Sequence, residues 1–273
     1  MPAGAGRPGQ RFCLFHAAPG DAPRGQVLYV HPFAEEMNKT RRMAALQARA
    51  LAQAGYAVLQ PDLLGCGDSS GDFGDASWQD WIADVLEAAR WLQRRSDAPL
   101  WLWGLRAGCL LANAAALLLP GPRRLLFCQP TPAGKTVLQQ FLRLRTAAEL
   151  LQGGSARAGG ATDALRRQLA AGSSVEVAGY ALSPQLAAGL EQATLRPPEA
   201  AVGDRLECIE VDSRAEASLS PATERLLAAW RVAGGSARGQ AVTGPAFWQT
   251  TEIEIAPALL AATLPALAEE VAA

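Results

Sequence analysis

P-L-W-L-W-G-L-R-A-G-C-L-L-A, residues 99–112, changes character at its centre. Its first half is a short apolar run typical of a buried strand, and a run rich in Ala and Leu, typical of a helix, follows Gly108. Gly104 and Gly108 flank the change, and glycines mark places where a chain turns tightly. We therefore predict a buried strand, a sharp turn and a helix.

A sharp turn from a strand into a helix has the shape of a nucleophile elbow. In the G-x-S-x-G version, the central serine presents its hydroxyl group at the helix N-terminus, where free backbone N–H groups stabilise an oxyanion. The central residue here is Arg106. A guanidinium group is permanently charged and only donates hydrogen bonds, so it cannot attack a carbonyl carbon as serine or cysteine does. The stretch indicates a fold more clearly than a reaction.

Segments of strand and helix type alternate along residues 1–134, and this alternation predicts a mostly parallel sheet with helices on both faces. The alternation stops between Lys135 and about Ala201 and resumes afterwards. We expect an α/β core made of residues 1–134 and 202–273, with residues 135–201 inserted as a helical lid over the carboxyl edge of the sheet. Besides the strand before the elbow, the clearest core elements are strands at 11–17, 26–32, 56–60, 125–129 and 206–211, a weak strand at 240–243, and helices at 38–54 and 77–95.

The composition excludes several classes of function. The sequence has 273 residues, of which 49% are hydrophobic and 19% charged, and its formal net charge is −1. So small a net charge attracts neither nucleic acid nor an anionic membrane surface. No apolar run approaches the ~20 residues that a membrane-spanning helix needs. The N-terminus is rich in Gly and Pro and lacks the apolar centre of a secretory signal, so we expect a cytoplasmic protein with no membrane span.

The sequence contains no pattern that indicates a metal or a cofactor. The five cysteines are widely spaced, mostly in apolar surroundings, which indicates buried, reduced thiols. There is no C-x-x-C pair, and the only histidines are His16 and His31, so we expect no zinc site. P-T-P-A-G-K-T, at 130–136, ends like a phosphate-binding loop, but that pattern requires a glycine where Gln129 stands. We therefore predict neither a metal nor a cofactor.

Six stretches, spread over nearly the whole chain, resemble those of one family. They are H-P-F-A-E-E-M-N-K-T-R-R-M (31–43), P-D-L-L-G-C-G-D-S-S-G (61–71), W-G-L-R-A-G (103–108), Q-F-L-R-L-R (140–145), V-A-G-Y-A-L-S-P (177–184) and F-W-Q-T-T-E-I-E (247–254). The chain resembles α/β-hydrolases, and more narrowly the second type of exosortase A system-associated hydrolase. This resemblance implies an α/β-hydrolase fold and hydrolysis of an ester or an amide, linked to envelope or exopolysaccharide biology.

The residues at the positions of a hydrolase triad do not match that implied activity. The triad of an α/β-hydrolase follows the chain order Ser, then Asp or Glu, then His. Arg106 occupies the serine position, and Asp212 or Glu216 could supply only the acid. No histidine follows His31, and the position expected for the base has the sequence G-P-A-F-W-Q-T-T-E, residues 244–252. Two members of the triad are therefore missing from their expected places.

Arg106 lies beside the positive end of a helix dipole, which is unfavourable unless an anion is close by. One interpretation is an internal ion pair with a carboxylate, for which the candidates are Glu35, Glu36, Asp62 and Glu252. Another is that Arg106 binds a ligand carboxylate or phosphate, because arginine makes bidentate contacts and helix N-termini hold anions. A direct catalytic role is the third.

Five further residues are candidates for the site, each with a structural alternative. His31, Glu35 and Asn38 would form the polar floor of a pocket, with His31 as a base in a Glu/His proton shuttle or simply as a packing residue. Trp248 either lines a ligand pocket or fills the space of a catalytic histidine. Cys109 is the fallback nucleophile if the helix dipole lowers the pKa of its thiol, and otherwise a buried thiol.

Two hypotheses of different classes follow. The first is an active hydrolase, which the resemblance favours. The second is a catalytically degenerate hydrolase fold that binds a small acidic ligand or a partner protein of the exosortase or exopolysaccharide system. The chemistry of the residues favours the second, because a fold does not by itself determine a reaction.

Overall fold

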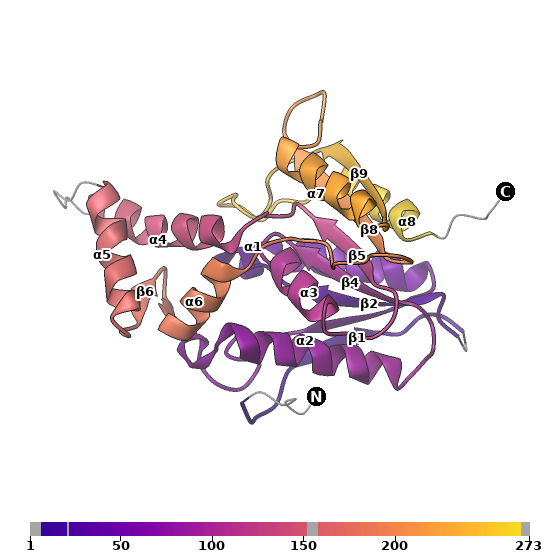
Figure 1. Ribbon diagram of the computed structural model, residues 1–273, viewed down its shortest axis with the longest axis horizontal. Coiled ribbons are helices and arrows are strands. Elements are labelled where there is room, and N and C mark those ends of the chain that lie inside the picture. Colours follow the sequence, from indigo (N-terminus) through magenta and orange to yellow (C-terminus); the bar gives the residue numbers. More distant parts are fainter. Residues whose placement is uncertain (1–6, 21, 152–157, 269–273) are drawn as a thin grey trace.

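A seven-stranded sheet runs through the centre of the molecule in the computed structural model, which describes residues 7–20, 22–151 and 158–268 (Figure 1). Its strands are β1 (Cys13–His16), β2 (Gly25–Val30), β3 (Tyr56–Pro61), β4 (Leu100–Leu105), β5 (Arg124–Cys128), β8 (Arg205–Asp212) and β9 (Ser236–Thr243). The order across the sheet is β1-β3-β2-β4-β5-β8-β9. Only β1 is antiparallel to its neighbour, so the predicted mostly parallel sheet is confirmed.

Helices cover both faces of the sheet, as the alternation predicted (Figure 1). The helices α1 (Glu35–Gln53) and α8 (Pro257–Leu267) contribute to one core, while α2 (Trp78–Gln93), α3 (Gly108–Ala116) and α7 (Pro221–Val232) contribute to the other. All six residues of β2 are buried because their side chains alternate between the two cores. In the described part of the chain, no helix is long and apolar enough to cross a membrane.

Helix starts follow the local signals in the sequence. The hydroxyl oxygen of Ser77 accepts a hydrogen bond from the Asp80 N–H, and this confirms the predicted start of α2. The helix α1 begins at Glu35, three residues before the predicted start at 38, because two acidic residues in its first turn suit the positive end of the helix dipole. Strand β9 covers 236–243 rather than 240–243, since it pairs with β8 along its whole length at an exposed edge where no apolar pattern is required.

A mostly helical segment lies between β5 and β8 and extends beyond one end of the sheet (Figure 1). It contains α4 (Gly134–Leu151), α5 (Ala158–Ala170), the hairpin of β6 (Val175–Val177) and β7 (Tyr180–Leu182), and α6 (Pro184–Gln192). The segment packs closely on the core, because a Cβ atom on Gly189 would lie only 2.2 Å from the Trp78 side chain.

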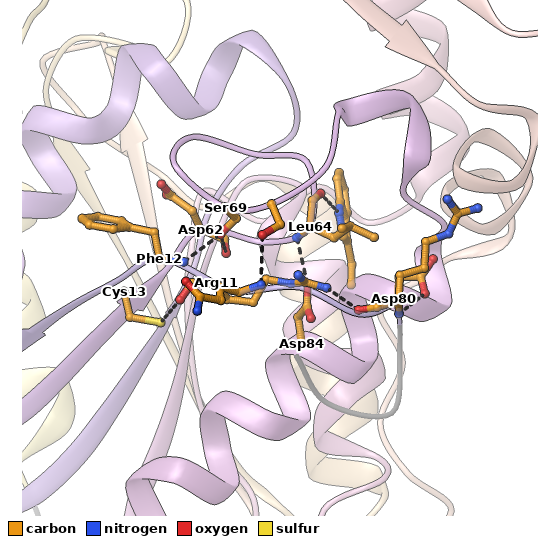
Figure 2. A network of polar contacts seen from close by, with 12 residues as sticks. Arg11, Phe12, Cys13, Asp62, Leu64, Ser69, Asp80 and Asp84 are labelled. Atoms are coloured by element: carbon orange, nitrogen blue, oxygen red, sulfur yellow. Dashed lines mark hydrogen bonds and ion pairs between the residues drawn. The ribbon is translucent and has the colours of Figure 1, made fainter. Parts of the chain in front are cut away.

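A buried ion pair joins the N-terminal segment to α2, beside the loop that follows β3 (Figure 2). Arg11 Nε donates to Asp84 Oδ2 at 2.7 Å, and the Leu64 N–H donates to the same oxygen at 2.8 Å. Nearby, the Asp62 N–H donates to the Phe12 carbonyl at 2.9 Å. The loop after β3 is therefore fixed at the edge of the sheet where β2 and β4 also end.

Candidate functional site

The strand, turn and helix predicted at residues 99–112 are present: β4 ends at Leu105 and α3 begins at Gly108. Arg106 has a φ of 55°, in the left-handed region that a residue with a side chain rarely adopts. Both glycines are required by close backbone contacts. A Cβ atom on Gly108 would lie 2.2 Å from the Val30 carbonyl oxygen, and one on Gly104 would lie 2.6 Å from the Cα of Cys109. The turn therefore has the strained geometry of a nucleophile elbow.

The guanidinium group of Arg106 forms an ion pair with Glu36, in the first turn of α1. Arg106 Nη2 lies 3.1 Å from Glu36 Oε1, and Nε lies 3.3 Å from both carboxylate oxygens. Only 12% of the Arg106 side chain and 16% of the Glu36 side chain are exposed. An internal ion pair was one predicted interpretation of Arg106, and the structure identifies Glu36 as the partner.

Trp248 covers the same guanidinium group from the segment between β9 and α8. The Cζ atom of Arg106 lies 5.2 Å from the centroid of the Trp248 ring, within the range of a cation–π contact. The Trp248 side chain is buried and packs edge-to-face on Phe247 at 5.2 Å between centroids. An indole therefore fills the space beside the elbow, close to where the sequence predicted the missing base.

Burial changes the pKa values of the two acidic residues at the start of α1. It raises the pKa of Glu36, and the Arg106 guanidinium offsets only part of that effect. Burial also raises the pKa of Glu35 above its ordinary value. Glu35 Oε2 has no hydrogen-bond partner among the residues that the structure describes. Folding therefore penalises the charged form of Glu35 more than its neutral form.

His31 is a buried, neutral hydrogen-bond acceptor. Its Nδ1 lies 2.8 Å from the Pro32 carbonyl oxygen, and since a carbonyl only accepts, the proton is on Nδ1. Its Nε2 is buried without a partner in the described residues, and burial lowers the pKa of the ring. Within the same residues, no hydrogen bond joins His31 to Glu35 or to Asn38, so the predicted polar floor is not a connected network. Asn38 instead donates to the Tyr180 hydroxyl at 3.1 Å.

Of the two alternatives for Cys109, the structure agrees with the buried thiol. Cys109 is 0% exposed and its Sγ lies 3.7 Å from the Cys128 carbonyl oxygen. Burial raises the pKa of this thiol well above its ordinary value, and the nearby Arg106 reverses little of that. The desolvation of a thiolate in the core outweighs the partial charge of one helix end, so Cys109 has the properties of a structural thiol.

Asp212, the candidate acid, forms an ion pair with Arg214 at the end of β8. Its Oδ2 accepts from Arg214 Nε at 2.8 Å, and its Oδ1 accepts from the Arg214 N–H at 3.0 Å. These hydrogen bonds lower the pKa of Asp212 to about 2. Glu216, the other candidate acid, lies exposed in the following loop. The residues at the three triad positions therefore form no relay.

Tyr180, which the sequence analysis missed, contacts the candidate site from the inserted segment. Its hydroxyl group accepts the hydrogen bond from Asn38, and its ring packs edge-to-face on Phe73 at 5.0 Å between centroids. These partners are 142 and 107 residues away along the chain, so no local pattern could reveal the contact. Burial raises the pKa of Tyr180.

Comparison with known proteins agrees with this architecture. Residues 21–170, more than half of the chain, match the family model described as serine aminopeptidase, S33. The chain is similar in structure to Est1E from Butyrivibrio proteoclasticus bound to ferulic acid, with a TM-score of 0.63, 14% identity, and coverage of 96% of this chain and 97% of that one. No curated protein sequence matches significantly.

Two other solved structures share the fold. An α/β serine hydrolase homologue from Coxiella burnetii has a TM-score of 0.53 and 13% identity, over 95% of this chain and 93% of that one. A thermostable carboxyl esterase from Bacillus coagulans, in complex with glycerol, has a TM-score of 0.54 and 14% identity, over 86% of each chain. Identities this low establish a common fold and leave the reaction to be argued from the residues.

Proposed function

The chain belongs to the serine aminopeptidase S33 family of α/β-hydrolases, and from that premise we propose that it is a member that does not hydrolyse esters or amides. In this proposal the site binds a small acidic ligand or a partner protein instead. The observation that carries it is Arg106 at the centre of the elbow, paired with Glu36 and covered by Trp248.

Hydrolysis through an acyl-enzyme needs a nucleophile and a base that deprotonates it. The guanidinium group at the elbow cannot attack a carbonyl carbon, the neighbouring Glu36 carboxylate is held in an ion pair with it, and no histidine follows His31 in the sequence. Cys109, the nearest thiol, is buried beneath the turn with a raised pKa. The family match alone favours the alternative, an active ester or amide hydrolase with a non-standard site.

An acidic ligand would bind by competing with Glu36 for Arg106. Glu36 lies in the first turn of α1, and burial raises its pKa, which makes protonation of its carboxylate less unfavourable. A ligand carboxylate or phosphate would then make the bidentate contact that Glu36 makes now. We assign the further ligand contacts to Glu35 and Asn38, with His31 and Trp248 as walls of the site.

The inserted segment 135–201 is proposed to act as a lid over this site. The hydrogen bond from Asn38 to the Tyr180 hydroxyl links the core to the insertion directly beside the acidic turn of α1. From the resemblance to exosortase A system-associated hydrolases, we propose that the partner belongs to an exosortase or exopolysaccharide system and that the protein is cytoplasmic.

Labelling with a fluorophosphonate probe tests the loss of hydrolysis. We expect no labelling of the wild-type protein, and none of Arg106→Ser, because a serine at the elbow still lacks a base. An active serine esterase of the same fold is the positive control. Stoichiometric labelling of the wild type, mapped by mass spectrometry to one serine or cysteine, would refute the proposal and support the active hydrolase.

Calorimetric titration with inorganic phosphate and with acetate tests the anion site. We expect millimolar binding to the wild type, loss of that binding in Arg106→Ala, and no change in Arg42→Ala, a matched variant at an exposed position of α1. Equal binding by the wild type and Arg106→Ala would remove the acidic ligand from the proposal.

A further inference from the structure

The two edges of the central sheet differ in the side chains that they expose. At the β9 edge, the exposed side chains include Arg238 and Gln240, which are charged or polar. At the β1 edge, Phe12, Leu14 and Phe15 are 40%, 46% and 42% exposed. Lysine or proline commonly protects a free edge from pairing with another chain, and β1, with the sequence C-L-F-H, contains neither. The β1 edge is therefore open to an added strand.

The backbone of β1 has hydrogen-bonding groups on its open side. In the described part of the chain, β1 pairs only with β3. The Asp62 N–H donates to the Phe12 carbonyl, so in this antiparallel ladder Phe12 and every second residue after it direct their backbone groups to β3. Pro61, which lies opposite Cys13 and has no N–H, fits this register. The N–H and C=O groups of Cys13 and Phe15 therefore point to the open edge, where an added strand needs them.

A pocket lies on each face of the sheet beside β1. Phe12 and Leu14 line one of about 160 Å³, together with Ala45 of α1. Phe15 lines the other, of about 150 Å³, together with Leu92 of α2. A cavity of about 150 Å³ holds one benzene ring, so each pocket has room for one apolar side chain. Successive side chains of a strand point to opposite faces, so neighbouring residues of an added strand reach both pockets.

Arg95 brings a positive charge to the pocket on the α2 side. It lines this pocket, and its guanidinium carbon lies 3.4 Å from the centroid of the Trp91 ring, which packs edge-to-face on Phe15 at 5.2 Å. The Arg95 side chain is exposed and forms no ion pair with any residue that the structure describes. A carboxylate on the added strand would make the bidentate contact that arginine favours. Because β1 itself contains no acidic residue, the edge strand of a second copy would not supply that carboxylate.

We propose that the β1 edge binds an extended segment of a partner protein, which adds to the sheet as one more strand. The segment has neighbouring apolar side chains for the two pockets and an acidic side chain for Arg95, and its backbone pairs with the open side of β1. Arg106, Glu36 and Trp248 line neither pocket, so this surface does not depend on the function proposed for the elbow.

Fluorescence anisotropy with synthetic peptides tests this surface on the whole protein. The capped, fluorescein-labelled peptides have the sequence E-T-X-X-X-T-E, in which X is Val, Leu or Phe. We expect at least one of them to bind saturably at one site. The same peptide with N-methyl groups on its central amides keeps its side chains but donates no hydrogen bonds there, and it should bind about tenfold more weakly or worse. Replacement of both glutamates by lysine should weaken binding to a similar degree.

Two pairs of variants locate the bound peptide. Cys13→Pro removes the N–H at the open side of β1 and should weaken binding about tenfold or more, whereas Cys13→Ala keeps that N–H and should bind like the wild type. Arg95→Glu should also weaken binding, whereas Arg225→Glu, with the same change in charge at an exposed position of α7, should not. Circular dichroism verifies that each variant is folded, and the Arg95 pair tests the surface if Cys13→Pro does not fold.

Several results would overturn the proposal. They are equal binding of the N-methylated or the lysine peptide, unchanged binding by folded Cys13→Pro or by Arg95→Glu, and no binding of any of the peptides. Sedimentation velocity of the protein alone tests the other occupant, a second copy, and we expect a monomer. A dimer that dissociates in Cys13→Pro would mean that a second copy covers this edge, which would also overturn the proposal.

Discussion

Arg106 and Trp248 lie in contact at the elbow, with the guanidinium carbon 5.2 Å from the centroid of the indole ring. They are separated by 142 residues in the sequence, and Glu36 reaches the same guanidinium group from a third part of the chain. A permanent cation, a carboxylate and an indole thus occupy the place where a hydrolase of this fold keeps a nucleophile and its base. The predictions below test the energetics and chemistry of this arrangement.

The pair of Arg106 and Glu36 should show strong coupling in a double-mutant cycle. Arg106→Met leaves a mostly buried carboxylate unpaired, and we expect it to lower the free energy of unfolding by about 1–3 kcal/mol. The double variant Arg106→Met/Glu36→Leu should lose less than the sum of the two single variants, with a coupling of about 0.5–3 kcal/mol. Urea denaturation measures all four proteins. Additive losses would show that the ion pair contributes nothing.

Trp248 should stabilise the fold mainly through burial. Trp248→Ala leaves a cavity over the guanidinium group, and a loss of about 3–5 kcal/mol in the free energy of unfolding is expected. Trp248→Phe keeps an aromatic face over Arg106 and should lose clearly less. Urea denaturation compares the two variants, and equal losses would argue that the cation–π contact and the ring volume are unimportant.

Because the backbone approaches Gly108 closely, we predict that any side chain at this position destabilises the folded protein. Gly108→Ala places a methyl group 2.2 Å from the Val30 carbonyl oxygen, and we expect it to destabilise the protein by at least about 1–3 kcal/mol. Gly160→Ala is the control, because Gly160 is exposed in α5 with no atom near its Cβ position. The control should be neutral or slightly stabilising. Thermal melts distinguish the two, and a neutral Gly108→Ala would contradict the elbow geometry.

The Cys109 thiol should be unreactive in the folded protein. It is buried with a raised pKa, whereas Cys13 is half-buried on the edge strand β1. Iodoacetamide at pH 8, followed by peptide mass spectrometry, should modify Cys13 first and Cys109 only after denaturation. Rapid modification of Cys109 under native conditions would restore it as a candidate nucleophile.

Glu35 should make stability depend on pH. Its folded-state pKa is raised above the ordinary value of 4.5, so the neutral form is favoured by folding. That contribution is fully present below the ordinary pKa and is lost as pH rises through the raised value. Wild-type stability should therefore fall relative to Glu35→Gln as the pH rises above 4.5. Glu199→Gln, at an exposed position, is the control. Urea denaturation at each pH measures the free energy of unfolding. A difference between the wild type and Glu35→Gln that is the same at every pH would contradict the prediction.

Local sequence signals predicted much of this fold. The glycines around Arg106, the Ser77 capping box and the apolar strands act over a few residues, so their consequences follow from short-range sterics and hydrogen bonding. The same reasoning left two roles open for Cys109, because the cost of desolvating a thiolate depends on how deeply the folded chain buries it. Burial is a property of the whole packed structure.

The sequence by itself determined that a strand turns sharply into a helix at Arg106, that this position holds an arginine where the elbow pattern has a serine, and that no histidine follows His31. Only the tertiary structure decided that Glu36, rather than another acidic residue, neutralises this cation, and that Trp248 covers it. It also decided that His31 Nε2 is buried without a hydrogen-bond partner among the residues that the structure describes. These relationships join residues far apart in the chain, and they exist only because the parallel sheet brings the carboxyl ends of its strands to one edge.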